Sequence, residues 1–155
     1  LGKTFSLTGW KVGWAIGPAH LTAGLRSAHQ FLTFTTPTPV QHGAVAALGA
    51  SETFYQDMRD SYRRKRDVLA AGLTRAGFDV YLPQGTYFLI AGHPQAADDR
   101  AFCRRLVAEA RVATIPPSVF YDDPTQVSGL VRFAFCKDEA TLEEAVARIE
   151  GFAGI

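Results

Sequence analysis

Residues 2–14 form the most informative run of the chain, and they read Gly2-Lys3-Thr4-Phe5-Ser6-Leu7-Thr8-Gly9-Trp10-Lys11-Val12-Gly13-Trp14. The glycines at 9, 13 and 17 recur every fourth residue, which fits neither the G-x-G-x-x-G fingerprint nor the P-loop of nucleotide-binding proteins. Residues 11–16 are a short apolar run that Gly17-Pro18 ends, a pattern typical of a buried strand followed by a turn. The run therefore predicts a strand over residues 11–16 that begins at Lys11, and it gives only weak support to a nucleotide-binding loop.

Outward from this run the pattern becomes helical and then mixed. Apolar residues at helical spacing predict three helices, and the long third one ends before Gly77. Beyond it, alternating and helical patterns predict an α/β or α+β arrangement with helices covering a small sheet. The expected helices are 19–30, 39–48, 51–75, 98–110 and 139–152, and the expected later strands are 78–81, 85–90, 112–115 and 131–135.

We place a domain boundary near residue 50. Residues 1–50 supply one strand and two helices, too little to bury a sheet, whereas residues 51–155 have the ~100 residues typical of an independent domain. The first segment is therefore expected to expose its large apolar side chains, which favours self-association. These side chains are Trp10, Trp14, Ile16, Phe31 and Phe34.

Composition excludes several classes of partner. The 155 residues carry a formal net charge of +1, with 47% hydrophobic and 20% charged residues. Such a balance gives no electrostatic reason to expect nucleic acid or an anionic membrane. No apolar run approaches the ~20 residues of a membrane span and no signal peptide is visible, so the expected compartment is the cytosol. Cys103 and Cys136 are expected to be buried free thiols, and the four histidines lack metal-site spacing.

Several separated motifs resemble the class I/II, fold-type I aminotransferases that use pyridoxal phosphate, particularly the branch of kynurenine and glutamine transaminases. The resemblance covers nearly the whole chain in the order of the family. Besides residues 2–14, it rests on His29-Gln30, Pro37-Thr38-Pro39-Val40-Gln41, Pro83-Gln84-Gly85-Thr86-Tyr87-Phe88, Ile115-Pro116-Pro117-Ser118-Val119-Phe120-Tyr121 and Val131-Arg132-Phe133-Ala134-Phe135. It implies an α/β fold, with residues 51–155 as the small C-terminal domain and residues 1–50 as a remnant of the large cofactor-binding domain.

The resemblance also implies roles for four residues. Lys3 matches the catalytic lysine that carries pyridoxal phosphate, and Lys11 matches a cation that contacts the cofactor phosphate. Arg132 matches the arginine that holds the substrate α-carboxylate, since a planar guanidinium can make two parallel hydrogen bonds to it. Phe34 lies where the family often places an aromatic side chain lining the substrate site across the dimer interface.

The family's remaining cofactor contacts precede the lysine and are not in this sequence. Among them is the aspartate that pairs with the pyridine nitrogen. We therefore expect that this chain alone is not a competent aminotransferase, and that it acts on amino acids and 2-oxo acids only as part of a homo-oligomer or with a missing N-terminal piece. Two alternatives stay open: part of a C–S lyase or another fold-type I enzyme, or a non-catalytic remnant acting as an oligomerising module.

Overall fold

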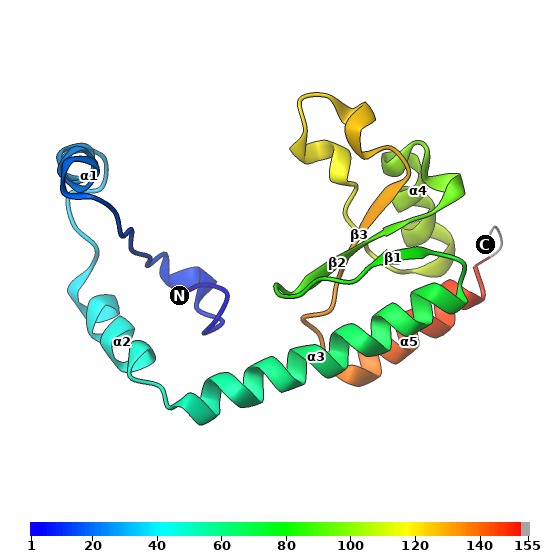
Figure 1. The fold of residues 1–155 in the computed structure, drawn as a ribbon, viewed down its shortest axis with the longest axis horizontal. Helices are drawn as coiled ribbons and strands as arrows, with labels where there is room; N and C mark the ends of the chain where they lie inside the picture. The colour runs from blue at the N-terminus through cyan, green and yellow to red at the C-terminus, as the bar shows by residue number, and fades with distance from the viewer. Residues whose placement is uncertain (153–155) are drawn as a thin grey trace. The chain divides into compact units, whose positions relative to one another are not determined.

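The computed structural model describes residues 1–152 and divides the chain into two compact units, residues 1–55 and a second unit that begins at Gln56 (Figure 1). The predicted boundary near residue 50 lies in the connection that precedes helix α3 (Glu52–Arg75). That the two parts are a large-domain remnant and a small domain remains a prediction. Among the described residues, no helix has the length and apolar character needed to cross a bilayer.

The first unit is helical. A 3-10 turn, Thr8–Trp10, precedes α1 (Ala19–Leu32) and α2 (Thr38–Leu48), so both predicted helices are confirmed. The strand predicted at 11–16 is wrong: these residues are irregular, and the side chain of Ile16 is 92% exposed. A strand needs a neighbour to pair its backbone groups, and no strand lies within residues 1–55 to provide one.

The same unit has no buried core. Neither α1 nor α2 contains a buried residue. The expected exposure of large apolar side chains is confirmed, since all five are at least 45% exposed. They are Trp10, Trp14, Ile16, Phe31 and Phe34.

The second unit contains an antiparallel sheet in the order β1-β2-β3, with β1 Asp79–Tyr81, β2 Phe88–Gly92 and β3 Leu130–Ala134. The strands expected at 78–81, 85–90 and 131–135 are present, the middle one displaced toward its C-terminal end. The strand expected at 112–115 is reduced to one bridge, in which Ile115 pairs with Arg132. Pro116 and Pro117 lack the N–H that a continued ladder requires, so pairing stops there.

Helices cover one face of this sheet. They are α3, then α4 (Asp99–Arg105), which continues as a π-helical turn over Leu106–Ala110, and α5 (Glu139–Glu150). Asp98 and Asp138 cap α4 and α5, because their carboxylates accept from the N–H groups of Ala101 and Thr141. Short 3-10 turns complete the unit at Pro94–Ala96, Pro117–Phe120 and Pro124–Val127.

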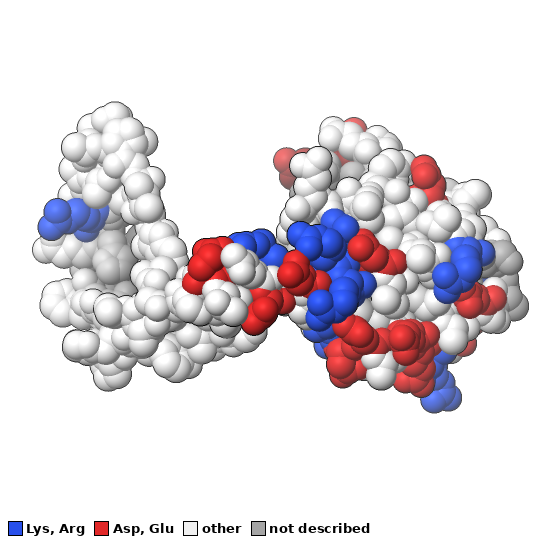
Figure 2. All heavy atoms as spheres, turned by 60° about the horizontal axis from the view of Figure 1, so that its bottom comes forward, with Lys and Arg blue, Asp and Glu red and all other residues white. Residues whose placement is uncertain are grey.

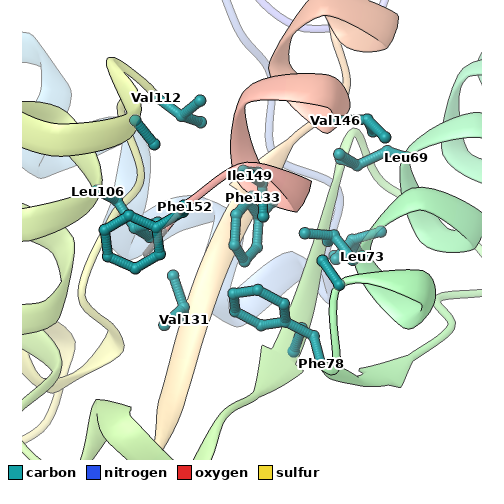
Figure 3. Packing of buried hydrophobic residues seen from close by; sticks show 14 of the residues in the cluster. Leu69, Leu73, Phe78, Leu106, Val112, Val131, Phe133, Val146, Ile149 and Phe152 are labelled. Atoms are coloured by element: carbon teal, nitrogen blue, oxygen red, sulfur yellow. The ribbon is translucent and has the colours of Figure 1, made fainter. Parts of the chain in front are cut away.

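The core lies between the helices and the covered face of the sheet (Figure 3). Strand residues Leu89, Ala91, Val131 and Phe133 alternate inward with burial, as the period of two requires. Figure 3 shows Val131 and Phe133 of β3 among helix residues and Phe78, and the Phe78 ring meets that of Phe133 edge to face at 5.4 Å. The buried helix residues are Leu69, Leu73, Phe102, Leu106, Leu142, Val146 and Ile149.

Candidate active site

Arg132 occupies the middle of β3 and points to the face of the sheet opposite the core. Its neighbours Val131 and Phe133 are buried, so the alternation along the strand turns Arg132 the other way. Its backbone is paired on both sides, with Ile90 of β2 and, through two hydrogen bonds of 3.0 and 3.1 Å, with Ile115. The Cα position of Arg132 is therefore fixed by the sheet.

Aromatic rings surround the Arg132 guanidinium. Its Cζ lies 3.9 Å from the ring centre of Phe88, 5.7 Å from that of Phe120 and 5.9 Å from that of Tyr87. A cation within about 6 Å of a ring centre is attracted by the negative face of the ring. Nη2 also donates a long hydrogen bond of 3.5 Å to the hydroxyl of Tyr87. The rings thus stabilise a guanidinium charge that would be unfavourable in an apolar strand without them.

No carboxylate among residues 1–152 forms an ion pair with Arg132. Its Nε is buried and has no hydrogen-bond partner within this part of the chain. A structural arginine of a core is ordinarily paired with an acid, because an unpaired buried charge is costly. This guanidinium therefore keeps donors available for a carboxylate that residues 1–152 do not supply.

The sequence missed part of this arrangement. From the sequence, Tyr87 and Phe120 are predicted to lie in the core of the small domain, with some prospect of lining a substrate channel. Phe120 is 63% exposed and Tyr87 is half-buried, so a core position is wrong for Phe120. Phe88 was not singled out, although its place two residues from Ile90 on β2 puts it on the face of Arg132.

Lys3 lies in a turn of the first unit that its neighbours anchor. Its carbonyl accepts from the N–H of Ser6 at 3.3 Å, and its side chain is exposed. Phe5, two residues on, stacks on Phe54 with ring centres 5.5 Å apart and meets Tyr55 at 6.1 Å. The turn that carries Lys3 is thereby held against the start of α3.

Lys11 and Phe34 share an uncommon backbone conformation. Their φ angles are 54° and 69°, in the left-handed region that side chains other than glycine rarely adopt. Such strained residues gather at functional sites more often than elsewhere. Both side chains are exposed, and Lys11 follows the 3-10 turn Thr8–Trp10. Lys3, Lys11 and Phe34 thus belong to the first unit and Arg132 to the second; that all four face one site stays a prediction.

Two lysines of the first unit have the chemistry needed to bind an aldehyde that carries a phosphate group. Lys3 offers a primary amine for the aldehyde and Lys11 a cation for the phosphate. Residues 1–51 contain no aspartate or glutamate, and Figure 2 shows acidic side chains starting only where α3 begins. The residue types of this segment therefore suit an anionic group, but residues 1–51 supply no acid for a pyridine nitrogen.

The titratable groups of the second unit outside the Arg132 site have structural roles. Burial, with the charge of Arg105, lowers the pKa of His93, which stacks on Phe102 at 5.2 Å. Asp99 is buried and accepts from the N–H and hydroxyl of Ser118, both at 2.8 Å. Burial raises the pKa of Cys103, as a buried thiol should show, whereas Cys136 is exposed and its expected burial is wrong. Residues 1–152 contain no cluster of ligands able to hold a metal ion.

The chain is similar to known proteins over nearly its whole length. The profile of the family "Aminotransferase class I and II" matches residues 1–149. A kynurenine–oxoglutarate transaminase of Dictyostelium discoideum is 40% identical over 93% of this chain and 38% of its own length. The methionine aminotransferase of Escherichia coli is 41% identical over 96% of this chain and 39% of its own length.

A solved structure gives the same result. The N-succinyldiaminopimelate aminotransferase of Mycobacterium tuberculosis matches 98% of this chain and 40% of its own chain, with a TM-score of 0.88 and 44% identity. The chain therefore spans about two fifths of the length of the relatives it matches. On this evidence, the chain belongs to the class I and II aminotransferases and has their fold-type I architecture.

Proposed function

We propose that this chain is the C-terminal part of an aminotransferase that moves an amino group between an amino acid and a 2-oxo acid. In this proposal Lys3 carries the pyridoxal phosphate of the family, Lys11 contacts its phosphate, and Arg132 binds the substrate α-carboxylate. Phe34 lines the substrate site from across a subunit interface. The observation that carries the proposal is the Arg132 guanidinium, held by rings and without an acidic partner in the described chain.

The residues of this chain would perform distinct steps. Pyridoxal phosphate, when bound, withdraws electrons from the bonds of the substrate α-carbon. Arg132 would fix the carboxylate with two parallel hydrogen bonds, so that the bond to be broken is held in one orientation. The Lys3 Nζ would take the proton from the α-carbon and return it at a neighbouring atom, as general base and then general acid. Lys11 would neutralise phosphate as a point charge.

We also propose that these residues act only together with the remaining part of the enzyme. The absence of aspartate and glutamate from residues 1–51 supports this, because that segment leaves the pyridine nitrogen without a partner. The family's amino-acid and 2-oxo-acid substrates, a homo-oligomer and a cytosolic location complete the proposal. The exposed apolar side chains of the first unit support a covering partner, either the missing large domain or a second subunit.

A chimera tests this function. The part of the Mycobacterium tuberculosis relative that precedes its match to Leu1 would be joined before Leu1, so that the fused chain has the length of the relative. We expect transamination that Lys3→Ala abolishes and that the matched control Lys137→Ala, at another exposed lysine, leaves unchanged. A folded chimera whose activity survives Lys3→Ala would refute the assignment, and product analysis would separate transamination from C–S lyase chemistry.

A non-catalytic role has one observation in its favour, the exposed rings and aliphatic side chains of residues 1–55. If the chain acts as an oligomerising module, the purified 155-residue chain should self-associate through this surface. Sedimentation velocity of the chain and of its Phe31→Ser variant measures this. A monomer at micromolar concentration would remove the role.

A further inference from the structure

We infer that Phe88 and Tyr87 are positioning residues, which set the orientation of the Arg132 guanidinium for carboxylate binding. The inference deepens the proposed function and rests on it, because it gives those residues a purpose only if Arg132 binds a carboxylate. It concerns side chains of one unit, and each contact on which it depends lies between β2, β3 and the turn before β2.

The sheet register brings Phe88 to Arg132. Ile90 lies directly opposite Arg132 and Phe88 lies opposite Ala134, so Phe88 is the diagonal neighbour of Arg132 on the same face. Long and aromatic side chains reach across this diagonal. The result is the 3.9 Å approach of Cζ to the Phe88 ring centre, the closest of the three ring contacts. Stacking at this distance sets the plane of the guanidinium, and with it the direction of its N–H groups.

Tyr87 sets the position of one edge of the same group. Its hydroxyl accepts the hydrogen bond from Nη2 at 3.5 Å, and its carbonyl accepts from the N–H of Phe135 at 2.9 Å. The preceding residue, Thr86, has a φ of 69°, which is an outlier for a β-branched side chain. A strained residue persists only where its surroundings enforce it. The turn therefore places Tyr87 and Phe88 beside Arg132, and the strained backbone of Thr86 is the energetic cost of this placement.

Holding the charge with rings has a consequence that an acid would not have. An aspartate or glutamate beside Arg132 would occupy the two parallel donors and compete with a substrate carboxylate. The rings attract the cation through their faces, and apart from the long hydrogen bond from Nη2 to Tyr87 they occupy none of the donors at its edge. The buried Nε without a partner fits this arrangement, since the stack covers the group without satisfying it. Phe88 and Tyr87 thus orient Arg132 and keep it available.

The experiment uses the 155-residue chain, labelled with ¹⁵N in arginine, and propionate as the carboxylate probe. Arg132→Lys assigns the side-chain signals of Arg132, and titration with an equal concentration of chloride is the control for salt. In the wild type, ring currents should shift the Arg132 signals from those of the exposed arginines, and propionate should move them further. Phe88→Leu should lose the ring-current shift and bind propionate about 3- to 30-fold more weakly.

Two further variants keep the test decisive if Phe88→Leu unfolds. Phe88→Tyr retains the ring and should restore both the shift and the affinity. Tyr87→Phe removes only the hydroxyl and should weaken propionate binding about two- to fivefold, since the hydrogen bond is long. Ile90→Val, which trims the same face without removing a ring, is the matched control and should leave both readouts unchanged.

The outcomes separate this inference from the proposed function. If folded Phe88→Leu keeps the wild-type affinity and Arg132 signals, Phe88 has only a packing role and the inference is overturned. If the wild-type Arg132 signals are ring-shifted but propionate does not move them, the carboxylate role itself is refuted and the inference with it. Weaker binding in Phe88→Leu and Tyr87→Phe, with rescue by Phe88→Tyr, supports both.

Discussion

The contact between α3 and α5 predicts the effect of one added methyl group. Gly72 is buried on α3, and a Cβ built on it would lie 2.3 Å and 2.4 Å from the two γ-carbons of Val146 on α5. Ordinary contacts begin near 3.4 Å, so the alanine side chain of Gly72→Ala would clash with both methyl groups of Val146. The helices or Val146 must move by about 1 Å, and overpacking of this kind costs roughly 1–3 kcal/mol.

Helix propensity opposes this cost. Replacing a helical glycine with alanine gains about 1 kcal/mol, so the net effect of Gly72→Ala should be a loss of roughly 0–2 kcal/mol. Urea unfolding followed by far-ultraviolet circular dichroism measures it. Gly24→Ala is the matched control, because its Cβ would meet open space, and it should stabilise α1.

A double-mutant cycle identifies the cause of the loss. In a Val146→Ala background both γ-carbons are gone and only the Cβ of residue 146 remains close, at 2.9 Å. Gly72→Ala should therefore cost less there than in the wild type, with a coupling of about 0.5–3 kcal/mol between the two sites. A Gly72→Ala variant that stabilises the wild type by the full propensity gain, with no coupling to Val146, would refute the close packing of α3 on α5.

Three further predictions concern the second unit. Arg132→Lys in the chimera should raise KM for the amino acid at least tenfold in steady-state kinetics, because an ammonium cannot form the two parallel hydrogen bonds; an unchanged KM would remove Arg132 from the site. The lowered pKa of His93 favours its neutral form, so its contribution to stability is present above the unfolded value near 6.5 and is lost as pH falls through the folded pKa. The melting temperature should therefore fall between pH 7 and pH 5, and fall less in His93→Asn; equal slopes would contradict this. Asp99→Asn should cost about 1–3 kcal/mol in urea unfolding, since one of the two Ser118 donors loses a carboxylate acceptor, and a neutral variant would show that the buried pair is dispensable.

Local signals predicted much of the second unit. The helix over Glu52–Arg75 was predictable because apolar residues recur along it and Gly77, with a φ of 84°, can end it. The caps Asp98 and Asp138 were predictable for the same reason, since a carboxylate three residues before a free N–H is a local pattern. Each of these elements depends on residues close to it in the sequence.

Elements that depend on distant partners were less predictable. Residues 11–16 have the apolar character of a buried strand, but residues 1–55 contain no strand to pair with them. Residues 112–115 lose their strand because the ladder with β3 stops at Pro116 after one bridge. In both cases the sequence indicates that a segment favours a β-strand, but it does not show whether a neighbouring strand is present to pair with it.

The candidate site divides in the same way. Arg132 could be singled out because a charge in an apolar strand requires a partner. Its partner rings could not, since Phe88 and Tyr87 reach it only through a register that joins residues 88 and 134. Lys3, Lys11 and Phe34 were chosen by resemblance, and their roles stay predictions.

The site of covalent attachment of pyridoxal phosphate tests the central claim most directly. The folded chimera would be incubated with the cofactor, reduced with borohydride, digested and analysed by mass spectrometry. The chain has four lysines that could be labelled, Lys3, Lys11, Lys65 and Lys137. The account predicts that one reduced cofactor is attached at Lys3 in stoichiometric amount, and that the 155-residue chain alone shows no such selectivity. Attachment spread over the exposed lysines of a folded chimera, or confined to a lysine other than Lys3, would contradict it.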